Sequence, residues 1–248
     1  MDLSDINKRE RKFHNQLHTS GEEDRTHQNK YYKALFSLRK DFLKDLELET
    51  NSKDVLDYGC GIGNFAKKVK KFNPKKIVAV DISEEAIKKA KNNLNKDNNI
   101  DFRVENCENL NLDSDSFDIV YGGGILHHLN LDKSLVELKR ILRKDGKIIF
   151  VEPLATNPLI NLYRKFTPKA RSIDEHPFKF SDLRLIKKIF KSVEIKYYGF
   201  FTLLFFKFYK DPENSKLFKF LNALDKVFLN SKYLKFLAWS VLIKAKKN

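Results

Sequence analysis

The stretch Val55-Leu56-Asp57-Tyr58-Gly59-Cys60-Gly61-Ile62-Gly63-Asn64 decides the fold of this chain. It predicts a buried strand that ends in a carboxylate and passes through a glycine turn into a helix. Glycines in such a turn let the backbone approach a ligand closely. A dinucleotide site needs its third glycine one residue later, where Asn64 stands, and Asp57 would repel a diphosphate. The turn therefore predicts a zwitterionic ligand whose ammonium lies near Asp57.

A second carboxylate, Asp81, ends the next predicted strand, 24 residues after Asp57. Ser83 is a suitable N-cap for the helix that follows, and Glu84 and Glu85 are favourable in its first turn. A carboxylate at the carboxyl end of the second strand can accept hydrogen bonds from both hydroxyls of a ribose. We therefore expect Asp81 to hold a ribose.

Short β-branched runs alternate with amphipathic segments from Asp54 onward, which is typical of a parallel sheet covered by helices. The expected strands are residues 55–57, 77–82, 102–104, 117–121, 147–151, 193–198 and 238–245. The expected helices are residues 65–72, 84–94, 134–142 and a segment that opens near Ser181. The sequence thus predicts an α/β fold, with a Rossmann-like, doubly wound, mostly parallel seven-stranded sheet.

The domain prediction places an N-terminal helical cap at residues 1–50 and one domain at residues 51–248. Within that domain we expect a core at 53–151, an irregular region at 152–192 beside the ligand edge, and a helical insertion at 199–237 before the last strand. With 248 residues, 42% of them hydrophobic, the chain can bury one sizeable core.

Several functional classes are limited by composition. The first residues are polar, and the most hydrophobic stretch, residues 199–206, falls well short of the roughly 20 apolar residues that span a bilayer. We therefore expect a cytoplasmic protein. Cys60 and Cys107 have no metal-motif partners nearby, so we expect reduced, buried residues and no metal, with a disulfide as the alternative.

The chain is strongly basic, with a formal net charge of +15 from 48 basic and 33 acidic residues. This charge permits attraction to nucleic acid, anionic lipid or an anionic small molecule. The charge does not identify which of these the protein binds. Lysine side chains exposed to solvent are an equally good explanation of the charge.

The glycine turn and Asp81 are the first two of six motifs that follow in order along the chain. The six are the Asp57 to Gly63 turn, Asp81-Ile82, Asn106-Cys107-Glu108-Asn109-Leu110, Ser116-Phe117-Asp118-Ile119-Val120, Leu126-His127-His128-Leu129, and Leu138-Lys139-Arg140-Ile141-Leu142-Arg143-Lys144-Asp145-Gly146. The ordered set, over about residues 53–151, resembles the class I S-adenosylmethionine-dependent methyltransferases. The resemblance is strongest to their branch related to ubiquinone and menaquinone biosynthesis methyltransferases.

The resemblance implies S-adenosylmethionine as cofactor, with its methionyl end on the glycine turn, its ribose on Asp81 and its adenine near Asn106 and Cys107. The implied cofactor-binding residues are Asp57, Gly59, Cys60, Gly61, Gly63, Asp81, Ile82, Asn106, Cys107, Gly122 and Gly123. Relatives commonly carry Asp where Asn106 stands; the Asn carbonyl can still accept a hydrogen bond, without charge assistance.

Three histidines are candidate catalytic residues. His127 and His128 follow the fourth strand, near the edge where the transferred methyl group should emerge, and His176 lies in Asp174-Glu175-His176-Pro177. Imidazole is a plausible base for a hydroxyl acceptor, but methyl transfer from a sulfonium requires no dedicated base. The alternatives are structural: packing or bracing for His127 and His128, and a turn before Pro177 for His176.

The insertion combines an apolar stripe with lysines. Its apolar residues recur at helical spacing: Leu217, Phe220, Leu221, Leu224, Val227 and Phe228. Residues 199–248 carry a local charge of +7. The stripe predicts a lid that packs on the core or on a second subunit, or else a surface that roofs a lipid pocket or lies on an anionic membrane.

The sequence therefore predicts a methyltransferase for a small-molecule or lipid-like acceptor, with methylation expected at oxygen and nitrogen or carbon left open. An RNA methyltransferase is the alternative enzyme. We expect no nucleic acid, because the chain has no appended RNA-binding motif and no Asn/Asp-Pro-Pro-Tyr/Phe segment. A non-catalytic scaffold on the same fold is the alternative of another class, and the oligomeric state is left open.

Overall fold

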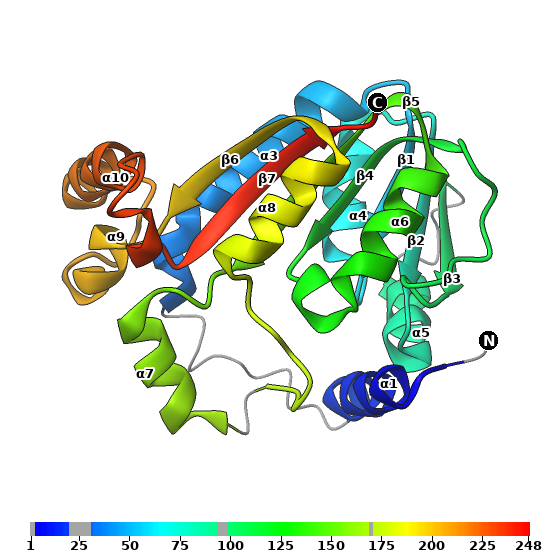
Figure 1. Ribbon diagram of the computed structural model, residues 1–248, viewed down its shortest axis with the longest axis horizontal. Helices are drawn as coiled ribbons and strands as arrows, with labels where there is room; N and C mark the ends of the chain where they lie inside the picture. Colours follow the sequence, from blue (N-terminus) through cyan, green and yellow to red (C-terminus); the bar gives the residue numbers. More distant parts are fainter. Residues whose placement is uncertain (1–2, 20–30, 94–98, 169–170) are drawn as a thin grey trace.

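The computed structural model describes residues 3–19, 31–93, 99–168 and 171–248 (Figure 1). Its centre is a seven-stranded sheet in the order β3-β2-β1-β4-β5-β7-β6. The strands are β1 (Asp54–Tyr58), β2 (Lys76–Asp81), β3 (Ile100–Val104), β4 (Phe117–Gly123), β5 (Leu142–Pro153), β6 (Lys191–Tyr198) and β7 (Ser240–Lys246). β7 runs antiparallel to both β5 and β6, and the pairs among β1 to β5 are parallel. The predicted fold is confirmed.

Helices cover both faces of the sheet. They are α1 (Asp5–Thr19), α3 (Phe36–Thr50), α4 (Asn64–Val69), α5 (Glu84–Asn93), α6 (Leu131–Ile141), α7 (Pro158–Phe166), α8 (Phe180–Ile189), α9 (Phe201–Leu204) and α10 (Lys216–Leu229). Short 3-10 helices are η1 (Lys33–Leu35), η2 (Lys70–Phe72), η3 (Leu126–His128), η5 (Phe206–Phe208) and η6 (Lys235–Leu237). Figure 1 shows α6 and α8 on one face and α3 and α4 on the other.

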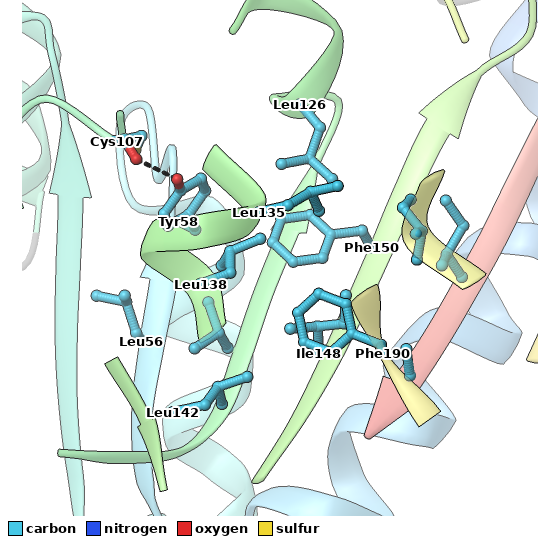
Figure 2. Packing of buried hydrophobic residues seen from close by; sticks show 14 of the residues in the cluster. Leu56, Tyr58, Cys107, Leu126, Leu135, Leu138, Leu142, Ile148, Phe150 and Phe190 are labelled. Atoms are coloured by element: carbon cyan, nitrogen blue, oxygen red, sulfur yellow. Dashed lines mark hydrogen bonds between the residues drawn. The ribbon is translucent and has the colours of Figure 1, made fainter. Parts of the chain in front are cut away.

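The alternation of side chains along β1 divides the core into two layers. Leu56 and Tyr58 belong to the cluster that contains Leu138 of α6, as Figure 2 shows, whereas Val55 packs with Phe42 of α3. All five residues of β1 are buried, as expected for a central strand covered on both faces. This burial fixes the position of the turn that follows β1.

The N-terminal cap lies beside the carboxyl edge of the sheet. The Asn15 side chain of α1 accepts a hydrogen bond from Ser83 Oγ at 2.6 Å and donates one to Glu84 at 3.2 Å, at the start of α5. Ser83 Oγ also accepts from the backbone N–H of Ala86 at 3.1 Å, which confirms the predicted N-cap. The cap thus covers the sheet at the end where the predicted ligand turn lies.

The insertion between β6 and β7 is helical, as predicted, and folds on itself. The buried Asp225 of α10 accepts hydrogen bonds from Phe201 N–H at 2.6 Å and from Thr202 Oγ1 at 2.7 Å, which ties α10 to the start of α9. The predicted apolar stripe of α10 is divided: Leu221 is buried, whereas Phe220 and Val227 are 60% and 72% exposed. Within this chain the core therefore covers only part of the stripe, and contact of the rest with a second subunit or a membrane stays a prediction.

Some predicted boundaries differ from the structure. The helix expected at 134–142 begins at Leu131 because Asn130 Oδ1 accepts from Lys133 N–H at 3.2 Å and caps it. β5 begins at Leu142 rather than at residue 147, since Leu142 pairs with Phe117 before a register shift. The helix expected at 65–72 is α-helical to Val69 and continues as η2, and the expected end of helix 84–94 lies outside the described residues. Among the helices of the described ranges, none is long and apolar enough to span a membrane.

Candidate active site

A buried carboxylate lies beneath the glycine turn. Asp57 in β1 is 1% exposed, and its Oδ2 has no hydrogen-bond partner within the described part of the chain. Burial raises the pKa of Asp57 to about 7; the nearby charge of Asp81 adds to this effect, and the Tyr121 hydroxyl and the Ala66 backbone oppose it. A buried acceptor without a partner is costly, so this position suits a cationic ligand group.

The glycine turn is held against β2 and leaves space on its ligand side. Gly59 N–H and Cys60 N–H both donate to the Val80 carbonyl, at 2.9 and 2.8 Å. Gly61 has φ of +51°, and a Cβ placed on it would meet no atom within 4 Å. Gly59, at φ of +79°, would bring a Cβ to 2.5 Å from Ile125. Gly59 is therefore required for packing, whereas Gly61 faces open space where a ligand can approach.

Asp81 is positioned by backbone donors at the end of β2. Its Oδ2 accepts from Gly61 N–H at 2.8 Å and its Oδ1 from Ser83 N–H at 2.9 Å. Each carboxylate oxygen can accept a further hydrogen bond, so the half-buried Asp81 has capacity for two hydroxyl donors. Ile82, also half-buried, follows directly.

The expected adenine residues are largely occupied by the fold itself. Asn106 is buried, and its Oδ1 accepts from Glu108 N–H at 3.0 Å. The Cys107 carbonyl accepts a hydrogen bond from the Tyr58 hydroxyl. Both Cys60 and Cys107 are free, buried thiols, as expected, and burial raises the pKa of each well above its ordinary value. The adenine contact through Asn106 stays a prediction.

The glycines that end β4 and Gly63, which begins α4, have different surroundings. A Cβ on Gly122 would lie 2.6 Å from Phe150 and 2.7 Å from the Tyr58 carbonyl oxygen, so Gly122 lies inside the packed core. A Cβ on Gly63 would lie 3.0 Å from Phe102. Gly123 is exposed and lines a cavity at the carboxyl edge. A Cβ on Gly123 would also lie 3.0 Å from a neighbour, Phe65, but of these three glycines only Gly123 lines the cavity.

His127 is oriented by a carboxylate inside the protein. Its Nδ1 lies 2.7 Å from Oε2 of Glu152, which is fully buried in β5. Glu152 Oε1 accepts from Ile125 N–H at 3.1 Å and Leu126 N–H at 2.8 Å. One carboxylate therefore fixes both the backbone of η3 and the His127 ring. Glu152 therefore lies behind His127.

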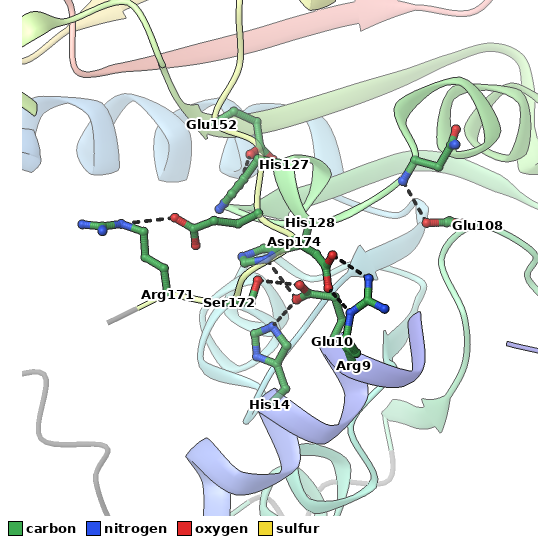
Figure 3. A network of polar contacts seen from close by, with 12 residues as sticks. Arg9, Glu10, His14, Glu108, His127, His128, Glu152, Arg171, Ser172 and Asp174 are labelled. Carbon is green, nitrogen blue, oxygen red and sulfur yellow. Dashed lines mark hydrogen bonds and ion pairs between the residues drawn. The ribbon is translucent and has the colours of Figure 1, made fainter. Parts of the chain in front are cut away.

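His128 contacts the N-terminal cap (Figure 3). Its Nδ1 lies 3.2 Å from Glu10 Oε2, and Glu10 also accepts a hydrogen bond from Ser172 Oγ at 2.5 Å and lies 3.5 Å from His14 Nε2. Burial lowers the pKa of His128, and the Glu10 contact opposes that shift only in part. Burial would raise the pKa of Glu10, but its contacts with His128, His14 and Ser172 outweigh burial and lower it.

His176 is not brought together with the other two imidazoles. Its side chain is exposed, and its backbone N–H donates to the His127 carbonyl at 2.7 Å. The neighbouring Asp174 forms a bidentate pair with Arg9 of α1, both contacts being 2.8 Å. This segment therefore fastens the cap, and the geometry gives no support to an acid/base role for His176.

A cavity of about 410 Å³ opens beside the end of β4. Its lining includes Gly123, Gly124, His127 and His128; the aromatic residues Phe13, Tyr31, Tyr32, Phe42, Phe65, Tyr163 and Trp239; and the charged residues Arg39, Arg164, Arg171 and Glu175. Asp57, Gly61 and Asp81 do not line it. The cavity is thus adjacent to the glycine turn and separate from it, as expected for a second ligand.

Sequence reasoning missed the contribution of α1, α7 and Arg171. Burial lowers the pKa of Arg164 to about 10, and Arg171, which is also cationic, adds to this effect. The spacing of Glu10 and His14, four residues apart on a helix, was the available signal, because it places both side chains on one face. Arg164 and Arg171 carry no comparable local pattern.

Comparison with known proteins identifies the class. Residues 56–150 match the family model described as Methyltransferase domain. A ribosomal protein L11 methyltransferase of Thermotoga maritima is 36% identical over 108 residues, which are 44% of this chain and 39% of the relative. A ubiquinone/menaquinone biosynthesis C-methyltransferase of Hydrogenovibrio crunogenus is 31% identical over 115 residues, 43% of this chain and 44% of the relative.

The chain spans about two fifths of the length of these curated relatives. A solved structure of geranyl diphosphate C-methyltransferase from Streptomyces coelicolor A3(2) superposes on the whole chain and over its own whole length, with a TM-score of 0.66 at 14% identity. That likeness shows the fold. Residues 56–150 therefore form a methyltransferase domain, and the class that the sequence predicted is confirmed.

The raised pKa of Asp57 predicts a specific pH dependence of stability. Because the pKa rises from an ordinary 3.8 to about 7, the folded chain holds a proton that the unfolded chain releases, so the free energy of unfolding should fall as pH rises from 4 to 7. The slope from this group is at most about 1.4 kcal/mol per pH unit. We expect Asp57→Asn to remove this contribution of Asp57 to the pH dependence of the free energy of unfolding.

Urea denaturation of both proteins between pH 4 and 8 measures the effect. The exposed Asp113→Asn is the control and should retain the wild-type pH profile. Equal pH slopes for the wild type and Asp57→Asn would contradict the assignment.

Proposed function

We propose that this chain transfers a methyl group from S-adenosylmethionine to a small-molecule or lipid-like acceptor, at oxygen. The observation that carries the proposal is the juxtaposition of three features: the unpartnered buried oxygen of Asp57, the open space at Gly61, and Asp81, 2.8 Å from Gly61 N–H. An ammonium satisfies the first, a close ligand backbone the second and a ribose diol the third. In a scaffold protein that binds no ligand, the buried carboxylate oxygen of Asp57 would remain without a partner, at a cost in stability.

The cofactor, when bound, supplies a methyl group on a sulfonium that is transferred by in-line displacement. The chain's own residues then have to align the acceptor and exclude water. The glycine turn and Asp81 hold one ligand, and Gly123 at the end of β4 separates it from the cavity where the acceptor lies. In this proposal residues 1–50 act as a cap on the domain at 51–248, because α1 carries groups that contact His128 and Ser172.

The chemistry of the cavity supports a small-molecule or lipid-like acceptor. Its volume of about 410 Å³ falls in the range of small-molecule sites, and its lining is mostly aromatic and aliphatic. Arg39, Arg164 and Arg171 add positive charge to the lining. The names of the relatives refer to ribosomal protein L11, to ubiquinone/menaquinone biosynthesis and to geranyl diphosphate, so a shared fold does not identify the acceptor of this chain.

His127 and His128 are the residues we propose to contact the acceptor. With a proton on Nδ1 shared with Glu152, the His127 ring carries its lone pair on Nε2. That nitrogen can take a proton from an acceptor hydroxyl. His128 is mainly neutral because burial lowers its pKa. His176 has no part in this proposal, since its side chain is exposed.

Cofactor binding tests the proposal directly. We expect calorimetric titration to give micromolar affinity for S-adenosylmethionine and S-adenosylhomocysteine, on the order of −8 kcal/mol. Asp81→Asn should weaken both at least tenfold, because the amide cannot accept two charge-assisted hydrogen bonds. Asp113→Asn is the matched control and should bind as the wild type does. A folded wild type that binds neither compound would favour the scaffold reading.

We also propose that the insertion contacts an anionic membrane. Phe220 and Val227 of α10 are mostly exposed, and Lys216, Lys219 and Lys226 lie on the same helix. Apolar side chains flanked by lysines suit the interface of an anionic bilayer. The insertion also reaches the cavity wall, since Phe206 packs on the cavity residue Tyr31 with ring centroids 4.8 Å apart. A lipid-like acceptor would then enter from the membrane.

Vesicle sedimentation measures this contact. The wild type should sediment with vesicles of phosphatidylglycerol and phosphatidylcholine and remain in solution with phosphatidylcholine alone. Replacing Phe220 and Val227 together by Ser should abolish sedimentation because both apolar contacts are lost. Val136→Ser, at a 67% exposed residue on α6, is the control. Equal sedimentation of the double variant and the wild type would refute the contact.

A further inference from the structure

Three potential metal ligands converge on the cavity. One nitrogen each of His127 and His128 and a carboxylate oxygen of Glu175 lie within 4.8 Å of one another. All three residues line the cavity, and their side chains are only 10%, 13% and 14% exposed. Two imidazoles and one carboxylate form a donor set that binds divalent transition-metal ions and leaves positions open for a further ligand.

A second carboxylate lies beside each imidazole. His127 Nδ1 is 2.7 Å from Glu152 Oε2, a hydrogen-bonding distance. A carboxylate in this position holds a metal-binding histidine in orientation and keeps the proton on Nδ1, so that the Nε2 lone pair can bind the ion. His128 Nδ1 lies 3.2 Å from Glu10 Oε2 but forms no hydrogen bond within the described residues.

The carboxylates themselves are anchored by other groups. Glu152 accepts two backbone hydrogen bonds at the start of η3, and Glu10 accepts one from Ser172. Glu175 lies with Oε1 3.2 Å from Arg171 Nε, so its other oxygen is the one available to an ion. The donor set is therefore fixed in place by the fold.

Carboxylates gather around the two imidazoles. Glu152 lies beside His127, Glu10 lies beside His128, and Glu175 is close to both histidines. The cations that line the cavity are Arg39, Arg164 and Arg171. A divalent ion held by the three ligands would favour an anionic oxygen on the acceptor.

We propose that His127, His128 and Glu175 bind a divalent transition-metal ion, which holds the oxygen of the methyl acceptor. The inference rests on the proposed methyl transfer and deepens it. The acceptor's O–H bond breaks, its proton leaves to water, and the electron pair stays on the oxygen next to the ion. That oxygen then forms the bond to the methyl carbon while the carbon–sulfur bond breaks and its electrons remain on sulfur. The Nε2 of His127 is in this case a metal ligand rather than the proton acceptor.

A competing group shares one of these residues. Glu10, His14 and His128 also offer atoms within 4.8 Å of one another. Glu10 and His14 do not line the cavity, however, and Glu10 already accepts a hydrogen bond from Ser172. An ion there would lie behind His128, away from the acceptor. His14 is therefore the residue that separates the two assignments.

Zinc binding to the full, EDTA-treated chain tests the proposal. Calorimetric titration with Zn²⁺ should show one ion per chain, and Co²⁺ should give visible absorption bands of a nitrogen- and oxygen-ligated site. Glu175→Gln should weaken Zn²⁺ binding at least tenfold and alter the Co²⁺ spectrum. His14→Gln should leave both unchanged.

Two results would overturn the assignment. One is the absence of stoichiometric binding by the wild type, and the other is loss of binding in His14→Gln with retention in Glu175→Gln. Titration of the same samples with S-adenosylhomocysteine keeps the two proposals apart. If the chain binds S-adenosylhomocysteine but not Zn²⁺, only the metal-site proposal is refuted. If it binds Zn²⁺ but not S-adenosylhomocysteine, the proposed methyl transfer is refuted. Circular dichroism verifies that each variant is folded.

Discussion

The buried carboxylate of Glu152 is the constraint on which the acceptor side of the site depends. It belongs to β5, is fully buried and accepts from two backbone N–H groups at the start of η3 while holding His127 at 2.7 Å. The Glu152 carbonyl in turn accepts from Ser240 Oγ at 2.7 Å, which ties the same residue to β7. Breaking such a buried, fully bonded group typically costs about 3–5 kcal/mol. The position of the His127 imidazole therefore depends on the sheet and not on a loop alone.

Helix α1 of the cap makes polar contacts at this edge. Arg9 pairs with Asp174 at the surface, and a half-exposed pair of this kind contributes little stability. Glu10, by contrast, is buried between Ser172 and His128. Glu10 thereby places α1 beside both His128 and Ser172.

The sequence was informative where the pattern is local. Asp57, the glycine turn and Asp81 could be predicted because strand, turn and helix follow one another within a few residues, and the structure places Asp81 2.8 Å from Gly61 N–H. The start of α6 was misplaced although its cap, Asn130, is a recognisable signal. β5 starts earlier than predicted because pairing of Leu142 with Phe117 depends on tertiary contact. Local hydrophobic patterns do not encode such contacts.

The contacts that assemble the acceptor side join residues far apart in the chain. Glu10 accepts a hydrogen bond from Ser172, 162 residues away in the sequence. No local sequence pattern around either residue predicts this contact. The exposed half of α10 was also beyond prediction, because a helix with apolar residues on two faces does not reveal which face the fold covers. The glycine turn could therefore be predicted from the sequence, whereas the cavity proposed for the acceptor could not.

A crystal structure with S-adenosylhomocysteine bound would show whether the glycine turn and Asp81 hold the cofactor. We expect the amino group of the ligand beside Asp57, both ribose hydroxyls on Asp81 and the sulfur directed past Gly123 into the cavity lined by His127 and His128. A ligand absent from the glycine turn at saturating concentration, or one with its sulfur directed away from that cavity, would contradict the account.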